Sequence, residues 1–147
     1  HAARAAARQA KVHARVGVVA EGDEGAPYRP DAAVGGKALS HALRAVQEFD
    51  DASACRDVFV DLTGERWRFL EWALAETRCL SSLPYGYQLH HPADCLGDTG
   101  AACGATMAVL AMRAFERNYA NGASALLVTS SDAGERAAML IHAPERH

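Results

Sequence analysis

The sequence predicts an α/β domain with a mixed sheet and helices on both faces. Segments with the apolar spacing of strands and of helices alternate along the chain in the order β-α-β-α-β-α-β-β. This alternation favours a mostly parallel sheet with right-handed crossovers. The last two strand segments flank a short Asp/Gly turn, so they predict a hairpin that adds an antiparallel edge. The chain has 147 residues, of which 50% are hydrophobic, and this suits one domain with a substantial core.

Each element follows from the local pattern of apolar residues. Short apolar or alternating runs bounded by polar residues predict strands. They span residues 12–20, 58–60, 85–91, 125–129 and 136–141. Apolar residues three and four positions apart predict helices. They span residues 37–49, 65–78 and 101–119. Residues 21–36 carry glycine, proline and acidic residues and predict a loop.

The second helix is expected to begin after Thr63, because threonine is a good N-cap residue. Charges between Glu65 and Glu71 recur at a spacing of three, which is typical of a solvated face. Two apolar stripes are expected on the core side, made by Trp67, Leu70 and Leu74 and by Phe69 and Trp72. One of the aromatic residues is alternatively left exposed as an anchor for a partner.

The third helix is the most informative element of the sequence. Its first three turns contain Met107, Val109, Leu110 and Met112 and are apolar on all sides. A helix of this kind is buried on more than one face. A lone two-layer domain covers only one face of such a helix, so we expect a second protein layer over the outer face.

Composition and charge exclude several functional classes. The chain has 15 Lys and Arg against 18 Asp and Glu, a formal net charge of -3, and no basic run, which argues against nucleic-acid binding. The sequence contains no run of about 18 apolar residues, so it predicts no membrane helix. Residues 1–11 lack the apolar core of a signal peptide. We therefore expect a cytoplasmic protein with reduced thiols. Residues 1–11 predict a tail or short helix and residues 12–147 the domain.

One stretch of the chain is specific enough to suggest a family. It contains a glycine loop, Gly97-Asp-Thr-Gly-Ala-Ala-Cys-Gly104, then the apolar helix, then the hairpin with Leu126-Leu-Val-Thr-Ser-Ser-Asp-Ala-Gly134 and Ala137-Ala-Met-Leu-Ile141. Together with the element order over residues 12–143, this resembles the C-terminal half of a β-ketoacyl synthase (3-oxoacyl-[acyl-carrier-protein] synthase), a thiolase-like protein. The resemblance implies a half-domain that packs against a second thiolase-like half, which would explain the apolar helix.

Two positions depart from the family's pattern. Its condensing enzymes use a nucleophilic Cys in the N-terminal half, which these residues do not include, and two His in the C-terminal half. The matching positions here hold Asp61, in Asp61-Leu-Thr-Gly-Glu65, and Asp98, directly after Gly97. Donors aimed at developing negative charge contribute about 3–4 kcal/mol each, whereas an ionised carboxylate only accepts hydrogen bonds and repels that charge. The resemblance therefore implies that this chain does not catalyse condensation alone.

Both aspartates have two interpretations. Asp61 follows a strand at its carboxyl end, where open α/β sheets place their sites, so it is a candidate catalytic carboxylate. Alternatively it orders the following turn or pairs with Arg66 or Arg68. Asp98 is the second candidate catalytic carboxylate, or it caps the third helix or an adjacent turn.

The glycine loop offers a candidate substrate site at a helix start, where the phosphate of an acyl-phosphopantetheine arm would lie. The candidate substrate-binding residues are Thr63, Gly97, Thr99, Gly100 and Cys103. The alternative is close packing of the loop against a neighbouring layer, with Cys103 as a small hydrophobe rather than a reactive thiol. The cysteines form no C-x-x-C pair, so the sequence predicts neither a metal site nor a resident cofactor.

Three functional hypotheses follow. The first is a ketosynthase-like, non-catalytic subunit or accessory protein that associates with a copy of itself or with a separate thiolase-like N-terminal half, and with an acyl carrier protein. The second is an acyltransferase or condensing subunit that acts on acyl thioesters with a nucleophilic Cys from another chain, with Asp61 and Asp98 as base or orienting groups. The third is a fragment of a longer synthase-like chain. An adaptor role in secretion is a further alternative.

Overall fold

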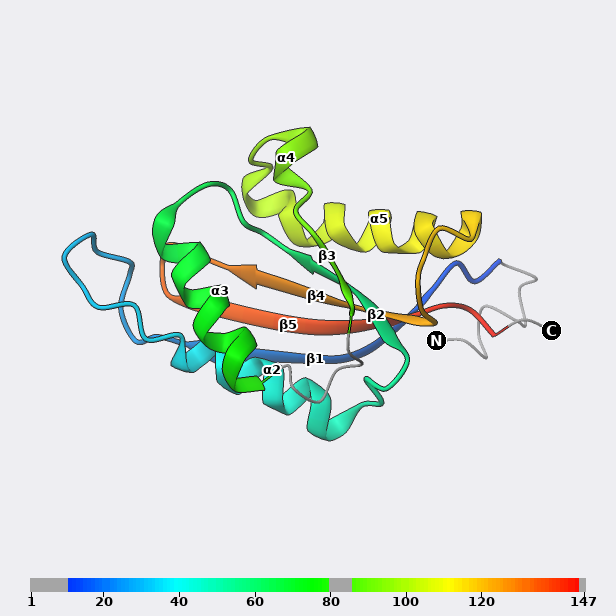
Figure 1. Ribbon diagram of the computed structural model, residues 1–147, viewed down its shortest axis with the longest axis horizontal. Helices are drawn as coiled ribbons and strands as arrows, with labels where there is room; N and C mark the ends of the chain where they lie inside the picture. Colours follow the sequence, from blue (N-terminus) through cyan, green and yellow to red (C-terminus); the bar gives the residue numbers. More distant parts are fainter. Residues whose placement is uncertain (1–10, 80–85, 146–147) are drawn as a thin grey trace.

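The computed structural model describes residues 11–79 and 86–145, which form a mixed sheet with helices on both faces (Figure 1). This is the predicted α/β class. The predicted tail or short helix over residues 1–11 lies outside the described residues except for Lys11, and so does the start of the extended segment predicted over residues 85–91.

The sheet has five strands in the order β1-β5-β4-β2-β3. The strands are β1 (Arg15–Asp23), β2 (Cys55–Val60), β3 (Gln88–His90), β4 (Ser124–Ser130) and β5 (Glu135–His142). Strand β2 pairs in parallel with β3 and with β4, whereas β5 is antiparallel to both β4 and β1. The hairpin is confirmed, but its place is not the predicted one: β5 lies inside the sheet, and β1 forms the edge beside it. The sequence predicts a mostly parallel sheet, but the parallel and antiparallel pairings are equal in number. The reason is that the first strand, β1, pairs with the last strand, β5.

Helices α2 (Lys37–Phe49) and α3 (Arg66–Cys79) cover one face of the sheet, and α5 (Cys103–Arg117) covers the other (Figure 1). The larger core lies under α2 and α3. Buried residues at its centre are Leu39, Leu43, Val46, Val58, Val60, Leu126 and Leu140. The smaller core lies under α5 and contains Phe59, Met107, Ala111, Phe115 and Leu127.

The helix over residues 37–49 is confirmed to the residue, whereas several strand and helix ends differ. Strand β1 begins and ends three residues later than predicted, and β2 begins three residues earlier. Helix α5 is shorter than predicted by two residues at each end. Two short helices were not predicted, α4 (Ala93–Leu96) and a 3-10 turn η2 (Gly100–Ala102).

The prediction of which α3 side chains are buried is only partly confirmed: Trp67 and Trp72 are buried as expected, and Phe69 is exposed, as in the alternative with one exposed aromatic residue. Glu71 is only 1% exposed and the Arg68 side chain is 11% exposed, while Phe69 and Leu70 are exposed. Charged side chains can be buried in this way only when they are paired, as they are here. Thr63 is not the N-cap either. The helix starts at Arg66, and the Glu65 carbonyl accepts its first backbone hydrogen bonds.

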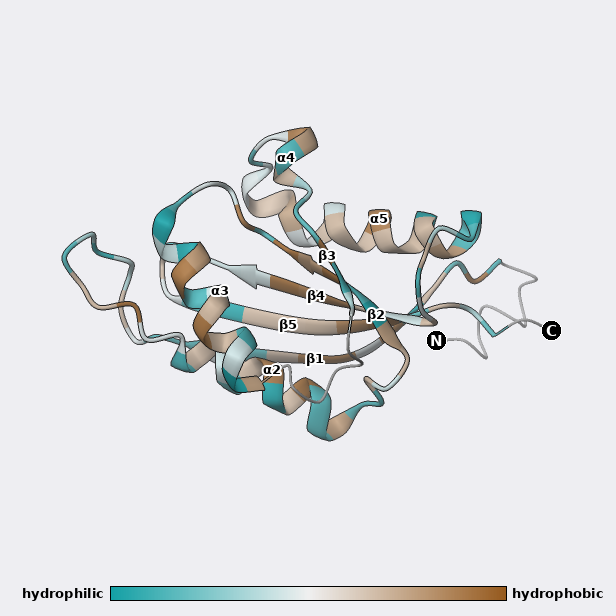
Figure 2. Cartoon of the chain, in the orientation of Figure 1, coloured by the Kyte–Doolittle hydropathy of each residue, from teal (hydrophilic) through white to brown (hydrophobic). Residues whose placement is uncertain are grey.

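Helix α5 is covered on one face only in the described structure. Met107 faces the sheet and is fully buried, whereas Val109 is 51% and Leu110 36% exposed. Figure 2 shows apolar residues along much of this helix, including the side away from the sheet. The outer apolar face on which the sequence argument depends is thus present.

Within the described ranges, none of the helices combines the length and the apolar character needed to cross a membrane.

Candidate functional site

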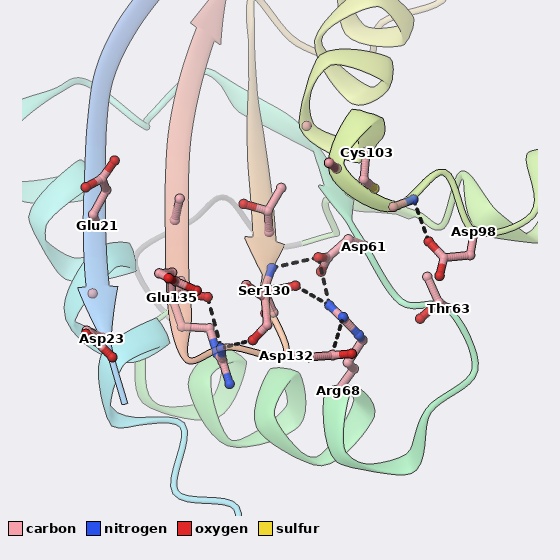
Figure 3. A pocket seen from close by; sticks show the side chains of 18 residues that line it. Glu21, Asp23, Asp61, Thr63, Arg68, Asp98, Cys103, Ser130, Asp132 and Glu135 are labelled. Carbon is pink, nitrogen blue, oxygen red and sulfur yellow. Dashed lines mark hydrogen bonds and ion pairs between the residues drawn. The ribbon is translucent and has the colours of Figure 1, made fainter. Parts of the chain in front are cut away.

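A cleft of about 890 Å³ lies at the edge of the sheet where β1, β2 and β4 end (Figure 3). The end of β1, the residues after β2 and β4, the start of β5 and the beginning of α5 all line it. Asp61 and Asp98, which come from segments 37 positions apart, both face this one cleft. Of the other candidate residues, Thr63, Gly100 and Cys103 line it as well, whereas Gly97 and Thr99 are not among its lining residues.

Asp61 follows β2 directly and is buried, with 6% of the residue exposed. Its Oδ2 atom accepts a hydrogen bond from the backbone N–H of Ser130 at 2.6 Å and pairs with Nη1 of Arg68 at 3.0 Å. Burial raises the pKa of Asp61 to about 6, although the Ser130 N–H and the Arg68 charge both act to lower it. The predicted pairing with Arg68 is confirmed, and the carboxylate ties the ends of β2 and β4 to α3.

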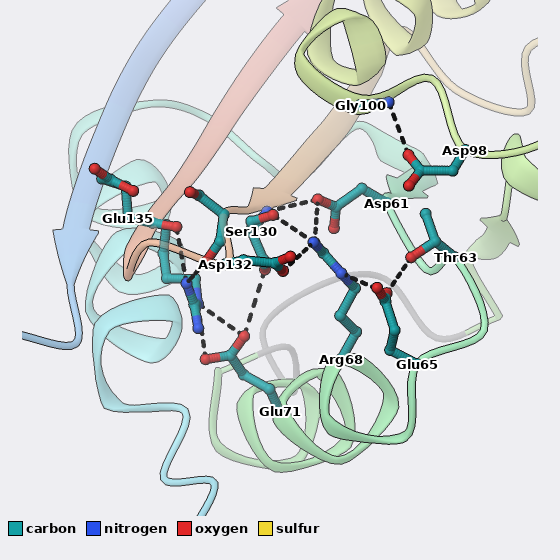
Figure 4. A network of polar contacts seen from close by, with 12 residues as sticks. Asp61, Thr63, Glu65, Arg68, Glu71, Asp98, Gly100, Ser130, Asp132 and Glu135 are labelled. Carbon is teal, nitrogen blue, oxygen red and sulfur yellow. Dashed lines mark hydrogen bonds and ion pairs between the residues drawn. The ribbon is translucent and has the colours of Figure 1, made fainter. Parts of the chain in front are cut away.

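Arg68 is the centre of this polar network (Figure 4). Besides Asp61 it contacts Oε2 of Glu65 through Nε at 2.8 Å and Oδ1 of Asp132 through Nη2 at 2.9 Å. Nη1 also donates to the backbone carbonyl of Ser130. One guanidinium therefore holds the start of α3, the end of β4 and the turn that follows β4.

A second buried ion pair lies beside the first. Nε of Arg136 donates to both carboxylate oxygens of Glu71 at 2.8 Å, and Nη1 donates to the carbonyls of Ser131 at 2.7 Å and Glu135 at 2.9 Å. Burial raises the pKa of Glu71, and the hydrogen bond from Arg136 opposes this rise. Both arginines also lie over the ring of Trp67, with guanidinium carbons 4.5 Å (Arg68) and 5.1 Å (Arg136) from its centroid.

Asp98 has a local role in the glycine loop. Its Oδ1 atom accepts a hydrogen bond from the backbone N–H of Gly100 at 2.7 Å, so the predicted capping of an adjacent turn is confirmed. The loop needs glycine at two points, because Gly97 and Gly100 have φ values of 73° and 54°. Asp98 itself is exposed.

Thr63 and Cys103 complete the candidate set at this edge. The Thr63 hydroxyl donates to the Glu65 carboxylate. Burial raises the pKa of the half-buried Cys103 thiol and the Asp61 charge raises it further, while a hydrogen bond with Thr99 acts the other way. The direction of this shift opposes a thiolate at the helix start, and the alternative role of Cys103 as a small hydrophobic residue agrees with its packing against the core under α5.

The cleft is acidic. Six carboxylates line it, from Glu21, Asp23, Asp61, Asp98, Asp132 and Glu135. Two arginines, Arg68 and Arg136, line it as well, and both are engaged in ion pairs. A phosphate entering the cleft would meet more negative than positive charge, and no arginine is held ready for it. Across residues 11–79 and 86–145 there is no group of three His, Cys, Asp or Glu side chains placed to hold a metal ion.

Sequence reasoning missed most of the polar network. It named Arg68 only as one of two partners for Asp61, and it assigned Glu71 to a solvated face. It gave no role to Arg136 or Ser130. A signal was present: Trp67 beside Arg68 and Glu71 places charges next to a large ring that must be buried, and Arg136 occupies an inward position of an alternating strand.

No family model and no curated protein matches the chain. Solved structures do match it. A type II PKS acyl-carrier protein in complex with its ketosynthase bound to the hexaketide has a TM-score of 0.83 at 15% identity over 97% of this chain and 41% of that one. The ishigamide ketosynthase/chain length factor has a TM-score of 0.82 at 15% identity over 97% and 41%. A β-ketoacyl synthase from Burkholderia phymatum STM815 has 0.75 at 18% identity over 97% and 40%.

The chain spans about two fifths of the length of these structures. Its identity with them is low, so the likeness concerns the fold, and the resemblance seen in the sequence is confirmed at that level. Nearly all of the chain, and not only its glycine loop and hairpin, follows the ketosynthase backbone. The protein therefore has the fold of a thiolase-like β-ketoacyl synthase half-domain.

Proposed function

We propose that this chain is a non-catalytic, ketosynthase-like subunit that acts by associating with a second thiolase-like half. The second half is a copy of this chain, a separate chain or a further part of the same protein. The observation on which the proposal rests is the state of Asp61. At the end of β2, where the resemblance places a catalytic histidine, the carboxylate is buried and engaged by Arg68 and the Ser130 N–H.

The cleft chemistry supports this proposal. Condensation needs hydrogen-bond donors aimed at an oxygen that becomes negative. Asp61 and Asp98 accept hydrogen bonds from groups of the chain itself, and neither ionised carboxylate has a proton to donate. Four further carboxylates in the lining oppose a developing oxyanion as well.

The uncovered face of α5 supports association. Val109 and Leu110 are exposed on a helix whose opposite face is fully buried against the sheet. An apolar helix face of this kind is stabilised when a second protein layer removes it from water, at about 25 cal/mol per Å² of apolar surface.

The test has two arms. The mass of the chain in solution is measured over a range of concentrations, alone and mixed with the product of the neighbouring gene. The proteins compared are the wild type, a Val109→Arg, Leu110→Arg variant and the control His41→Arg, which changes an exposed residue of α2 on the opposite side. We expect a complex with the wild type and His41→Arg that is lost in the α5 variant. Each sample is then assayed with malonyl and acyl thioesters, and no condensation is expected. A complex that survives both arginines contradicts association through α5, and turnover that requires Asp61 contradicts the non-catalytic role.

An acyl carrier protein is a further proposed partner, since one of the similar structures contains one. We do not place its acyl-phosphopantetheine arm in the acidic cleft of the chain alone. We expect the arm to be bound only where a second half adds positive charge. Titration of the chain and of the complex with a phosphopantetheine thioester distinguishes the two cases: binding to the isolated chain contradicts this expectation.

One observation favours the second candidate function, a condensing or acyltransferase subunit with a nucleophilic Cys from another chain. The pKa of Asp61 is raised to about 6, which suits a general base near neutral pH. In that case Asp61→Asn would abolish turnover by the assembled complex while leaving its mass unchanged.

A further inference from the structure

A loop over residues 24–36, which we call the 24–36 loop, is docked onto the turn between β4 and β5. The backbone N–H of Glu24 donates to the carbonyl of Gly134 at 3.1 Å, and that of Tyr28 donates to the carbonyl of Asp132 at 2.8 Å. Gly134 has a φ of 121°, and a Cβ there would lie 2.9 Å from the carbonyl oxygen of Ala26. Only glycine allows the loop to approach this closely.

An aromatic stack forms the third anchor of the loop. The Tyr28 ring lies 4.8 Å from that of Trp67, with 19° between the planes. Trp67 is buried, and its ring is also contacted by the guanidinium groups of Arg68 and Arg136. Of these ring contacts only the stack involves the loop itself, and the ends of the loop are held besides by hydrogen bonds from Ala38 N–H to the Glu24 carboxylate and from Arg78 to the Gly35 carbonyl.

Two of these three anchors meet at Arg68. The backbone carbonyl of Asp132 accepts a hydrogen bond from the N–H of Tyr28, and its carboxylate accepts one from Nη2 of Arg68. Arg68 also contacts Trp67, on which Tyr28 stacks. Among the three carboxylates that contact Arg68, Asp61 is the buried one, with 7% of its side chain exposed against 42% for Glu65 and 71% for Asp132. A loss of charge at Asp61 therefore weakens the hold on Arg68, which contacts both Asp132 in the turn and the Trp67 ring that anchor the loop.

We propose that the Asp61–Arg68 ion pair controls the docking of the 24–36 loop, so that neutralising Asp61 releases Tyr28 from Trp67 and opens the side of the cleft next to β1. The neutralising agent is a proton or a cationic group of a ligand that takes Asp61 from Arg68. The inference goes beyond the proposed function and does not depend on it.

The surroundings of Asp61 support a response to pH in a useful range. Arg68 and the more distant Glu71 approach it from α3, Cys103 from α5, and Asp132 and Glu65 compete for the same guanidinium. Burial and the Glu71 charge raise the pKa of Asp61 to about 6, while Arg68 lowers it. The described histidines are not part of this network.

Trp67 reports directly on the loop. Acrylamide quenching of tryptophan fluorescence is measured between pH 8 and pH 4.5 for the wild type, Asp61→Asn, Tyr28→Ala and Asp98→Asn, with Trp67→Phe to identify the Trp67 signal. Asp98→Asn is the matched control, because Asp98 lines the same cleft but its carboxylate accepts a hydrogen bond from Gly100 in its own turn rather than pairing with Arg68. We expect quenching of Trp67 to rise roughly twofold as the pH falls through about 6 in the wild type and in Asp98→Asn. Asp61→Asn and Tyr28→Ala should be strongly quenched at every pH.

A second measurement separates release of the loop from general loosening. Amide exchange of Tyr28 and Glu24 is compared between wild type and Asp61→Asn at one pH above 7, with circular dichroism as a check of folding. We expect faster exchange at these two amides and unchanged exchange in α2 and β4. The proposal is overturned if the wild type shows no transition near pH 6. It is also overturned if the Tyr28 amide stays protected in folded Asp61→Asn, or if Asp98→Asn changes the quenching as much as Asp61→Asn does. If Asp61→Asn does not fold, the wild-type titration decides alone.

Discussion

At the scale of single residues, the fold buries two carboxylates, Asp61 and Glu71, and places an arginine against each. Such pairs specify positions more than they add stability, because desolvation offsets much of their attraction. Here they set the end of β4 and the turn after it. The same pairs engage both arginines of the cleft, so residue chemistry, rather than fold, supports the proposed non-catalytic role.

The first prediction concerns the pH dependence of stability. The pKa of Asp61 is about 6 in the fold and 3.8 in the unfolded chain, so between these values the folded state binds the proton more tightly. The contribution of Asp61 is therefore most favourable at low pH, and the free energy of unfolding falls as the pH rises through this window, by about 3 kcal/mol in all. Asp61→Asn should remove this slope. Urea unfolding of both proteins between pH 4 and pH 7 measures it, and parallel curves would contradict the burial argument.

The second prediction concerns the buried pair Glu71–Arg136. Glu71→Ala leaves Arg136 buried without its partner and should cost about 3–5 kcal/mol. Glu65→Ala removes a more exposed partner of Arg68 and should cost less than about 1 kcal/mol. Replacing both members of the buried pair, as Glu71→Leu with Arg136→Met, should recover most of the loss. Chemical denaturation of the four proteins gives the comparison, and equal costs for Glu71→Ala and Glu65→Ala would show that the pair is not buried in solution.

At the scale of elements, how well the sequence predicts the structure depends on how local the determinants are. The helix over residues 37–49 is predicted to the residue because its apolar side chains follow one helical face, with Leu39, Leu43 and Val46 all buried. The position of β1 beside β5 was not predictable in this way, because their pairing joins residues more than a hundred positions apart. That pairing brings Glu21 and Asp23 to the cleft, so the acidic character of the site also needed the structure.

The third prediction distinguishes the two faces of α5. Met107 is fully buried under the sheet, so Met107→Ala should lower the free energy of unfolding by about 2–5 kcal/mol. Val109→Ala removes a side chain that is 51% exposed and should cost less than about 1 kcal/mol in the isolated chain. In the complex with a second half, Val109→Ala should weaken association instead. Thermal unfolding of the chain and a binding titration give the two values, and a large loss of stability from Val109→Ala in the isolated chain would place this residue in the core.

At the scale of the whole molecule, the chain has the fold of a ketosynthase half-domain, with an uncovered apolar helix on one face and a paired, acidic cleft at one edge of its sheet. The helix supports the proposed association and the cleft supports the proposed non-catalytic role, and the two features are independent. Glycine-loop and helix patterns in the sequence indicated the first. The second depended on long-range ion pairs that no local pattern contains.

The most direct test of the association claim is the mass of the protein in solution, alone and mixed with the product of the neighbouring gene. Association through α5 predicts a species of at least twice 15.6 kDa, or a complex with the partner, that dissociates when Val109 and Leu110 are replaced by arginine. A single 15.6 kDa species at every concentration, unchanged by the partner and by these substitutions, would contradict association with a copy of the chain or with that gene product.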